Sequence, residues 1–482
     1  MSKKPNLLFL FSDQHAQKIA GCYGNEIIQT PNLDRLAANG ITFNNAYCPS
    51  PLCVPSRMSL LSGRYPSQQE VWMNDDFLAS DVPTFAHSLG AAGYQPTIIG
   101  RMHAIGPDQL HGYVHREVGD HSPNSIGISR HNMGVLKGAP GPGRATIDKS
   151  GIGQSAYEVK DVATTDAAVE FFDQHDTSIP FCMTVGLMLP HAPYVASAED
   201  FALYDGKIDA AELPEPDQEH PWLQWWREKH DIVEVPEDHA VRARTAYYAL
   251  VTRMDIMIGE ILDKLQECDL LQNTLVVYSS DHGDQIGERG LWWKHTFYEE
   301  SVKIPMIVSW PGTLPEGEHR DHIVNLVDLN ATFLDALGAD PLPNSEGHSF
   351  LGIAKDANSE WHNETFSEYC SDVTKWDGMR QRMIRQDEWK LIYYHGFEPQ
   401  LFNLVNDPHE LNDLAATPEH AKTKTKLVNR LLENWNPIEI EQRMLDKQKD
   451  KEILGAWARK TSPTEAYIWD LTPEMNTLEE DT

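Results

Sequence analysis

The chain has 482 residues, which is long enough for one large domain with a full core and a smaller domain beside it. Hydrophobic residues make up 41% of the sequence and charged residues 23%, and these values exclude a disordered chain. The formal net charge of −32 argues against binding to nucleic acid or to an anionic membrane surface, so an anionic substrate needs a local positive site.

The first residues predict neither export nor membrane insertion. The apolar run Leu7–Phe11 is too short for the hydrophobic region of a signal peptide, lacks a small-residue cleavage site, and is typical of a buried strand. No apolar stretch reaches the length of a membrane span. The six cysteines show no CxxC pair and are expected to be reduced thiols. We therefore expect a cytoplasmic protein without a membrane partner.

From the amino end, short apolar strands alternate with longer amphipathic helices over about the first 360 residues. This order predicts an α/β domain with a large, mainly parallel sheet flanked by helices. The expected strands are Leu7–Phe11, Pro96–Ile99, Phe181–Leu187, Leu275–Tyr278 and Met306–Ser309. The expected helices are Asn32–Asn39, Pro83–Ala92, Asp161–Gln174, Val241–Cys268 and Leu329–Leu337.

Two stretches interrupt this alternation. Residues 104–153 are rich in Gly, His and Pro and have no clear periodicity, and residues 196–238 are acidic and contain three tryptophans. Both are expected to be long loops over one end of the sheet. Long ordered loops of this kind are where substrate specificity usually resides.

After about residue 360, strand-like segments at 365–369, 382–384 and 390–394 precede a helix near Pro418–Trp435, which predicts a small antiparallel sheet with one packing helix. We expect a catalytic domain, a C-terminal antiparallel-sheet subdomain and a C-terminal arm. Their ranges are 1–360, 361–440 and 441–482. The composition of the arm leaves two alternatives open, a segment docked in a homo-oligomer interface and a frayed tail.

Polar side chains directly follow four of the expected strands. Because the carboxyl ends of parallel strands form the crevice where α/β proteins bind ligands, these groups should converge in one site. Any one of them alone would more often be a cap or turn residue. The groups are Asp13 and Gln14, Arg101 and His103, His191, and Asp281, His282 and Asp284.

Asp13, Gln14, Asp281 and His282 form a coherent ligand set for one divalent cation. Carboxylate and amide oxygens suit Ca²⁺, which we expect first, or Mg²⁺. A histidine is a softer ligand that would also admit Mn²⁺ or Zn²⁺. The alternative for the Asp281-His-Gly segment is a simple turn after a strand.

The segment Cys53-Val-Pro-Ser-Arg57, followed by Ser62-Gly-Arg64, resembles the signature of the sulfatases of the alkaline-phosphatase superfamily. In that family a maturation enzyme oxidises the cysteine of C-x-P-S-R to formylglycine, and the hydrated aldehyde is the nucleophile. One oxygen of a geminal diol can attack sulfur, and the other can then expel sulfate. The resemblance covers residues 5–435 and includes Arg101-Met-His103, His191-Ala-Pro193, Asp281-His-Gly-Asp284 and Gly287–His295.

The resemblance also implies how the anionic substrate is held. The modified Cys53 would join the metal ligands, and Arg57 would hold the diol or a sulfate oxygen through charge-assisted hydrogen bonds. Arg101 and Lys294 would supply positive charge where negative charge develops on the transferring group. Asn74, some twenty residues after the cysteine, would bind sulfate.

Two histidines are implied as proton carriers. His191 would protonate the leaving alkoxide, and His103 would deprotonate the hemiacetal oxygen. The segment after Cys53 is a separate prediction. Ser56–Leu61, with Pro55 in its first turn, is expected to start a helix whose free N–H groups point at the anionic sulfate group.

Some positions depart from the usual pattern of the family. Gln14 and His282, where other residues are common, resemble the choline-sulfatase and phosphonate-monoester-hydrolase branch, as does the run Met102–Gly112. Arg101 stands where a lysine is usual. This exchange is not neutral, because arginine presents a planar fork of donors and lysine a point charge.

We therefore expect hydrolysis of sulfate monoesters, with a small organic sulfate or a sulfated saccharide as substrate. A phosphonate monoester or phosphodiester hydrolase with the same nucleophile is the alternative enzyme. A pseudo-enzyme or interaction protein is the alternative outside catalysis, and the intact Asp13, Cys53, Asp281 and Lys294 disfavour it.

Several tryptophans leave the substrate open. Aromatic rings could enclose a quaternary ammonium group such as that of choline, or stack on a sugar. They could equally be core residues. The candidates are Trp72, Trp222, Trp225, Trp226, Trp292, Trp293 and Trp376.

Overall fold

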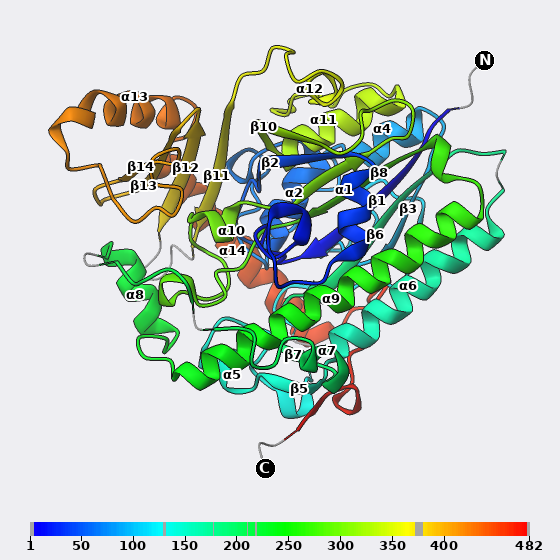
Figure 1. Cartoon of the computed structure of the whole chain (residues 1–482), viewed down its shortest axis with the longest axis horizontal. Coiled ribbons are helices and arrows are strands. Elements are labelled where there is room, and N and C mark those ends of the chain that lie inside the picture. The colour runs from blue at the N-terminus through cyan, green and yellow to red at the C-terminus, as the bar shows by residue number, and fades with distance from the viewer. Residues whose placement is uncertain are drawn as a thin grey trace.

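The computed structural model of the chain describes residues 4–128, 132–176, 178–209, 211–216, 219–371 and 379–479. Its largest element is an eight-stranded sheet between helices, and a separate four-stranded sheet lies to one side of it (Figure 1). The α/β fold expected from the alternation of strands and helices is confirmed.

The large sheet has the strand order β10-β2-β9-β8-β1-β6-β3-β4. β1 lies near the middle and pairs in parallel with β6 and β8, with Leu8 opposite Met183 and Val276. β9 runs antiparallel to both of its neighbours, whereas the other pairs are parallel. The strands are β1 (Asn6–Asp13), β2 (Ile41–Tyr47), β3 (Gln95–Gly100), β4 (His115–Glu117), β6 (Phe181–Pro190), β8 (Thr274–Ser280), β9 (Met306–Ser309) and β10 (Glu318–Asn325).

The central strands are continuously apolar because helices cover both faces of a parallel sheet. Every residue of β1, β6 and β8 is buried. All five expected strands are present. β2 and β10 were not predicted, since both interrupt their apolar residues with partly or fully exposed polar ones.

The five expected helices are also present. α6 and α9 pack against each other on one face of the sheet, and α2, α4 and α11 pack together on the other (Figure 1). The principal helices of this part are α1 (Pro31–Ala38), α2 (Cys53–Ser62), α4 (Phe85–Ala91), α6 (Ala156–Gln174), α9 (Glu237–Glu267) and α11 (Leu326–Leu337).

The two stretches expected to be loops contain short elements. The first holds β4, α5 (Arg144–Asp148) and the start of β5 (Gly151–Gln154), and the second holds α7 (Ala198–Ala202) and α8 (Pro221–Lys229). The tryptophan-rich part of the second stretch is the helix α8, which buries Trp222 and Trp226.

The smaller sheet is antiparallel, as predicted, and α13 packs on it. Its fourth strand was not predicted. The elements are β11 (Glu364–Cys370), β12 (Arg380–Gln386), β13 (Trp389–Tyr394), β14 (Gln400–Asn403) and α13 (Ala421–Leu432).

The C-terminal segment folds back onto its own chain. α14 (Pro437–Thr461) binds the large domain through Arg443, which lies 2.7 Å from Glu70, and Lys451, which lies 3.0 Å from Asp76. Beyond it, β15 (Thr477–Leu478) pairs with β5. The described part of this segment therefore packs on its own chain, and its place in a homo-oligomer interface stays a prediction.

None of the helices in the described residues is both long enough and apolar enough to cross a membrane.

Candidate active site

Polar side chains from the carboxyl ends of four parallel strands lie together at one edge of the large sheet. Asp13 ends β1, Arg101 follows β3, His191 follows β6 and Asp281 follows β8. Arg101 and His191 line a cavity of about 470 Å³. Its lining includes Cys53, Asn74, Arg101, His103, Tyr157, His191 and Lys294.

Cys53 is the first residue of α2, so the helix begins earlier than the sequence indicated. Two of its first three residues have no free N–H. Val54 donates its N–H to the amide oxygen of Asn74 (3.0 Å), and Pro55 has none. The helix end therefore offers fewer free donors to an anion than we expected, and Asn74 fixes the start of the helix.

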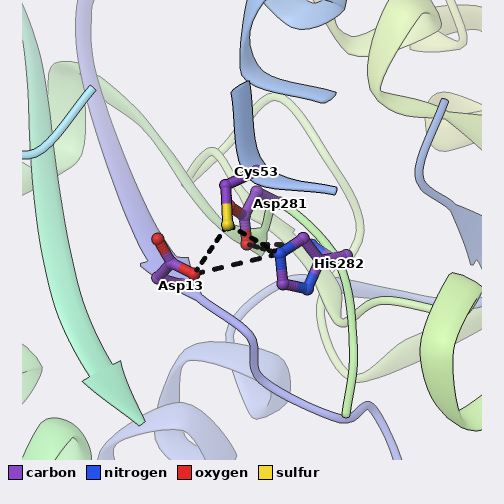
Figure 2. Close-up of side chains that lie close together, drawn as sticks. All are labelled: Asp13, Cys53, Asp281 and His282. Carbon is purple, nitrogen blue, oxygen red and sulfur yellow. Dashed lines mark hydrogen bonds and ion pairs between the residues drawn. The ribbon is translucent and has the colours of Figure 1, made fainter. Parts of the chain in front are cut away.

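Figure 2 shows Asp13, Cys53, Asp281 and His282 pointing toward one another, with ligand atoms that all lie within 4.8 Å. Cys53 Sγ is 3.1 Å from His282 Nε2 and 3.7 Å from Asp13 Oδ1. His282 Nδ1 is 3.0 Å from the carbonyl oxygen of Gly283, which can only accept. Nδ1 therefore carries the proton and Nε2 presents its lone pair to the centre. Burial lowers the pKa of His282 and keeps the ring neutral.

Gln14 is oriented by hydrogen bonds at both ends of its amide. Its Nε2 donates to Asp284 Oδ2 (2.6 Å), which also accepts from the hydroxyl of Tyr194 (2.5 Å). This fixes the amide oxygen on the opposite side, where it accepts from Lys294 Nζ (2.6 Å). The Gln14 backbone N–H donates to Asp281 Oδ1 (3.0 Å), which ties the ends of β1 and β8 together.

This arrangement fits one divalent cation. Two carboxylates and an amide oxygen are hard ligands suited to Ca²⁺ or Mg²⁺, and the imidazole lone pair also suits Mn²⁺. The hydrogen bonds that fix the His282 tautomer and the Gln14 amide are of the kind that orient metal ligands.

Arg57 lies below the cavity, fully buried, and pairs with both carboxylates. Its Nε is 2.8 Å from Asp281 Oδ2, and its Nη2 is 3.1 Å from Asp13 Oδ2. These contacts position the two carboxylates, and the expected contact of Arg57 with a diol or sulfate oxygen stays a prediction. Burial alone would raise the pKa of Asp13, but the charges of Arg101 and Arg57 hold that pKa well below its usual range. Asp13 is consequently ionised.

Arg101 connects Asp13 to a residue that the sequence did not reveal, Asp120. Arg101 Nε lies 2.6 Å from Asp13 Oδ2 and Nη1 lies 3.3 Å from Asp120 Oδ1. Asp120 also accepts the backbone N–H of His103 (2.5 Å). Its position in an aperiodic segment gave no signal of this role. Close approach of β3 and β6 fixes the Arg101 backbone, because a Cβ on Gly186 would lie 1.8 Å from the Arg101 carbonyl oxygen.

The imidazole of His103 lies beside the Arg101 guanidinium. Nδ1 accepts a hydrogen bond from Arg101 Nη2 (2.7 Å), since a guanidinium can only donate. Burial and the charge of Arg101 lower the pKa of His103 well below its usual value. The ring is therefore neutral at pH 7.

Lys294 and His191 meet above Cys53. Lys294 Nζ lies 3.2 Å from Cys53 Sγ and 3.0 Å from His191 Nε2. His191 Nδ1 lies 2.6 Å from the carbonyl oxygen of Ala192, so Nδ1 carries the proton and Nε2 accepts from the ammonium group.

Tyr157 lines the cavity and is a second residue that the sequence did not reveal. Its ring centroid lies 5.0 Å from that of His121 and 5.9 Å from that of His191. It comes from the first turn of α6, where an aromatic residue is indistinguishable in sequence from a core residue.

The tryptophans do not form a cage around the cavity in the part of the chain that the structure describes. Tyr157 is an aromatic residue in its lining, and Asp75 is an acidic one. Trp376 lies outside the described residues. Of the other candidate tryptophans, five are buried in the core and Trp225 is partly buried against it; the five are Trp72, Trp222, Trp226, Trp292 and Trp293.

A family model described as Sulfatase matches residues 5–339, which is more than half of the chain. The chain belongs to the sulfatase family. A second model, described as N-sulphoglucosamine sulphohydrolase, C-terminal, matches residues 287–436 and so covers the smaller sheet and α13.

Relatives of this sulfatase match it over nearly its whole length. A choline-sulfatase of Rhizobium meliloti is 33% identical, over 98% of this chain and 94% of the relative. An N-acetylglucosamine-6-O-sulfatase of Bacteroides thetaiotaomicron is 27% identical, over 90% of this chain and 86% of the relative. The sulfatase is thus a sulfuric ester hydrolase.

Solved structures share the fold. A protein in complex with its substrate D-glucosamine-2-N,6-O-disulfate superposes with a TM-score of 0.72 at 24% identity, covering 92% of this chain and 99% of that one. The phosphonate monoester hydrolase of Agrobacterium radiobacter superposes with a TM-score of 0.75 at 20% identity, covering 89% and 95%.

Proposed function

We propose that this sulfatase hydrolyses the sulfate monoester of a small organic molecule or short saccharide, using a formylglycine derived from Cys53 and one divalent cation. One observation carries the proposal. Cys53 Sγ lies at the cavity floor, 3.1 Å from His282 Nε2 and 3.2 Å from Lys294 Nζ. The nucleophile position is therefore next to both a metal-ligand set and a positive charge.

Asp13, Gln14, Asp281, His282 and the modified Cys53 would hold the cation, with Ca²⁺ the first candidate and Mg²⁺ or Mn²⁺ the alternatives. When bound, the cation supplies Lewis acidity that polarises a sulfate oxygen and favours the ionised aldehyde hydrate. Arg57 keeps the two carboxylates in place from below.

Residues of the cavity wall would bind the sulfate group. Lys294 brings positive charge to the cavity in a chain whose net charge is −32, so the local field would oppose the repulsion of the rest of the protein. Arg101 also lines the cavity, and its charge is balanced by Asp13 and Asp120. The amide oxygen of Asn74 is occupied by Val54, so its NH₂ group remains to donate to a sulfate oxygen.

Two histidines would move protons. His191 Nε2 accepts a hydrogen bond from Lys294 Nζ (3.0 Å), so after taking up a proton it could pass that proton to the leaving oxygen. His103 is held neutral by burial and by Arg101, which lower its pKa. Its Nδ1 accepts from Arg101 Nη2 (2.7 Å), so it would act as a base once that hydrogen bond is released.

The similarity to a choline-sulfatase makes choline sulfate the first substrate to test. Asp75 in the cavity lining pairs with Lys451 through Oδ1 (2.7 Å), so its second carboxylate oxygen would face a cationic group, and the ring of Tyr157 can contact that group. A sulfated saccharide is the second substrate to test, because another relative is an N-acetylglucosamine-6-O-sulfatase.

The test is a comparison of kcat/KM for choline sulfate, a sulfated monosaccharide, an aryl sulfate, an aryl phosphonate and a phosphodiester, with and without EDTA treatment. The proposal expects a sulfate ester to rank first, loss of activity after EDTA treatment, and recovery with Ca²⁺. A phosphonate or phosphodiester preferred by orders of magnitude would reject it. In the same assay Cys53→Ala should lose the hydrolysis of sulfate esters. Cys48→Ala is its matched control, because Cys48 is a buried cysteine outside the ligand set.

A further inference from the structure

A second group of potential metal ligands lies apart from the cavity that Cys53 lines. It consists of Asp328 near the start of α11, His348 before α12 (Leu351–Lys355), and His362 just before β11. One ligand atom from each residue lies within 4.8 Å of the others. Both histidines are exposed, and Asp328 is buried.

Asp328 is held rigidly but keeps unused acceptor positions. Its Oδ2 accepts the N–H of Asn325, and its Oδ1 accepts the N–H of His348, both at 2.9 Å. An ionised carboxylate has about four acceptor positions, so about two remain. Among the described residues, no lysine, arginine or histidine forms an ion pair with Asp328, which is unusual for a carboxylate that is 3% exposed.

The backbone fixes both histidines next to this carboxylate. The segment before His348 packs so closely on α11 that a Cβ on Gly347 would lie 1.8 Å from the carbonyl oxygen of Val327. The residue before His362 is also anchored, because Trp361 Nε1 donates to the carbonyl oxygen of Ile323 (2.7 Å).

The residue after His362 is anchored to the same strand. Asn363 Oδ1 accepts the N–H of Ile323 on β10 (3.2 Å), so both neighbours of His362 are bound to one residue. The rings of His348 and His362 lie 4.9 Å apart, centroid to centroid. The cluster is therefore fixed by contacts that do not depend on the imidazoles themselves.

We propose that Asp328, His348 and His362 form a second metal site, which binds a Zn²⁺-class transition-metal ion. Two imidazoles and one carboxylate are a ligand set typical of Zn²⁺, whereas Ca²⁺ prefers oxygen ligands only. Zn²⁺ bonds of about 2.0–2.2 Å in a tetrahedron bring ligand atoms to about 3.4 Å from one another, so only a small closure of the cluster is needed.

The fourth position of this site faces solvent. His348 and His362 line a separate cavity of about 970 Å³, together with Asp335 and Glu360. A water molecule or a small anion can complete the coordination there, and the two acidic residues favour entry of a cation.

The metal would join three segments that are distant in sequence. Its ligands come from a helix of the large domain, from the loop that follows it, and from the connection into β11 of the smaller sheet. Binding would stabilise this connection and leave the candidate active site untouched.

The test is calorimetric titration of the full-length protein with Zn²⁺ in excess Ca²⁺, for wild type, His348→Ala, His362→Ala and His319→Ala. His319 is an exposed histidine on β10 outside the cluster and serves as the control. Wild type and His319→Ala should bind one Zn²⁺ more than the two cluster variants, or bind it at least about 100-fold more tightly. The melting temperature should rise with Zn²⁺ only in wild type and His319→Ala.

Equal Zn²⁺ stoichiometry and affinity in all four proteins would overturn the proposal. Zn²⁺ that replaces Ca²⁺ in the candidate active site would appear equally in all four and so does not mimic the expected difference. Circular dichroism and sulfatase activity in Ca²⁺ alone should be the same for all four. If a cluster variant failed to fold, the visible spectrum of Co²⁺ bound to wild type would decide, since four-coordinate Co²⁺ supports the site and a purely octahedral spectrum rejects it.

Discussion

Two buried lysines of this sulfatase occupy opposite kinds of environment. Lys294 Nζ contacts an amide oxygen of Gln14, the sulfur of Cys53 and an imidazole nitrogen of His191, at 2.6, 3.2 and 3.0 Å. It lines the cavity at the edge of the large sheet. Lys390, in contrast, is fully buried in β13 of the smaller sheet.

Lys390 is surrounded by carboxylates. Its Nζ lies 2.8 Å from Glu299 and 2.7 Å from Glu410, and Glu299 also accepts from the hydroxyl of Tyr47 (3.0 Å). Glu299 begins α10 (Glu299–Val302) and Tyr47 ends β2, so this network connects the smaller sheet to the large domain.

The difference separates a charge used for folding from a charge available to a ligand. A buried cation between two carboxylates is neutralised, and removing it leaves uncompensated charges. A buried cation with only dipolar neighbours in contact keeps its positive potential, and at a cavity that potential can act on an anion. Burial alone does not distinguish the two lysines, whereas their contacts do.

The largest expected effect is on stability. Lys390→Met leaves the buried Glu410 without an ion-pair partner among the described residues, and leaves Glu299 with Lys303 at 3.7 Å, so it should lower the free energy of unfolding by about 3–5 kcal/mol at pH 8. Urea unfolding measures this. The exposed Lys426, also of the C-terminal region, is the control, and Lys426→Met should change the value by less than about 0.5 kcal/mol. If Lys390→Met were as stable as wild type, the ion pairs of Lys390 would not stabilise the fold, and the contrast with Lys294 would be wrong.

Lys294→Met should show the reverse pattern. The kcat/KM for an aryl sulfate should fall about 10²- to 10³-fold, because a charge that stabilises the transition state is lost. The free energy of unfolding should stay within about 1 kcal/mol of wild type, since no carboxylate loses an ion-pair partner in direct contact. Steady-state kinetics and urea unfolding on the same preparation test both parts. Full activity in this variant would show that the charge is not used.

A smaller effect is expected for Asp120, which contacts Arg101 and His103, two of the residues proposed to act on the substrate. Asp120→Asn should lower kcat/KM about 10- to 100-fold by loosening both side chains. In a protein that already carries Arg101→Lys, Asp120→Asn should lower kcat/KM much less, because Arg101 and Asp120 act as a unit. Additive losses in the double variant would contradict this coupling.

The smallest effect concerns pH. Burial raises the pKa of Glu410 to about 7, although Lys390 opposes this. A carboxyl with a higher pKa in the folded protein than in the unfolded chain stabilises the fold below the unfolded pKa, and this contribution is lost as pH rises through the folded value. Wild type should therefore lose about 1–3 kcal/mol more than Glu410→Gln between about pH 5 and pH 8. Urea unfolding at several pH values measures this difference. If the free energy of unfolding changed equally with pH in wild type and Glu410→Gln, the expectation would be contradicted.

The sequence revealed most of the fold and which polar residues lie together at the edge of the large sheet. The apolar strands were identifiable because a parallel sheet buries both faces, and the polar residues after them meet because the strands share one direction. β2 and β10 were missed because their apolar residues are interrupted, and the docking of α14 depends on contacts such as Arg443 with Glu70, which no local pattern encodes.

What the sequence could not predict was the direction of side chains within the site. Arg57 lies in the motif, yet its guanidinium points below the cavity toward Asp13 and Asp281. Asp120 and Tyr157 come from segments whose patterns are shared by ordinary loops and core helices. Such roles depend on how distant segments pack, which only the folded structure reveals.

The conversion of Cys53 is the most direct test of the proposed mechanism. Protein can be prepared with and without a co-expressed formylglycine-generating enzyme, and the peptide of residues 48–57 can be weighed by mass spectrometry. Conversion lowers its mass by a sulfur-for-oxygen exchange and two hydrogens. We predict that kcat/KM for a sulfate ester rises in proportion to the converted fraction. Equal activity in fully unconverted protein would contradict the mechanism.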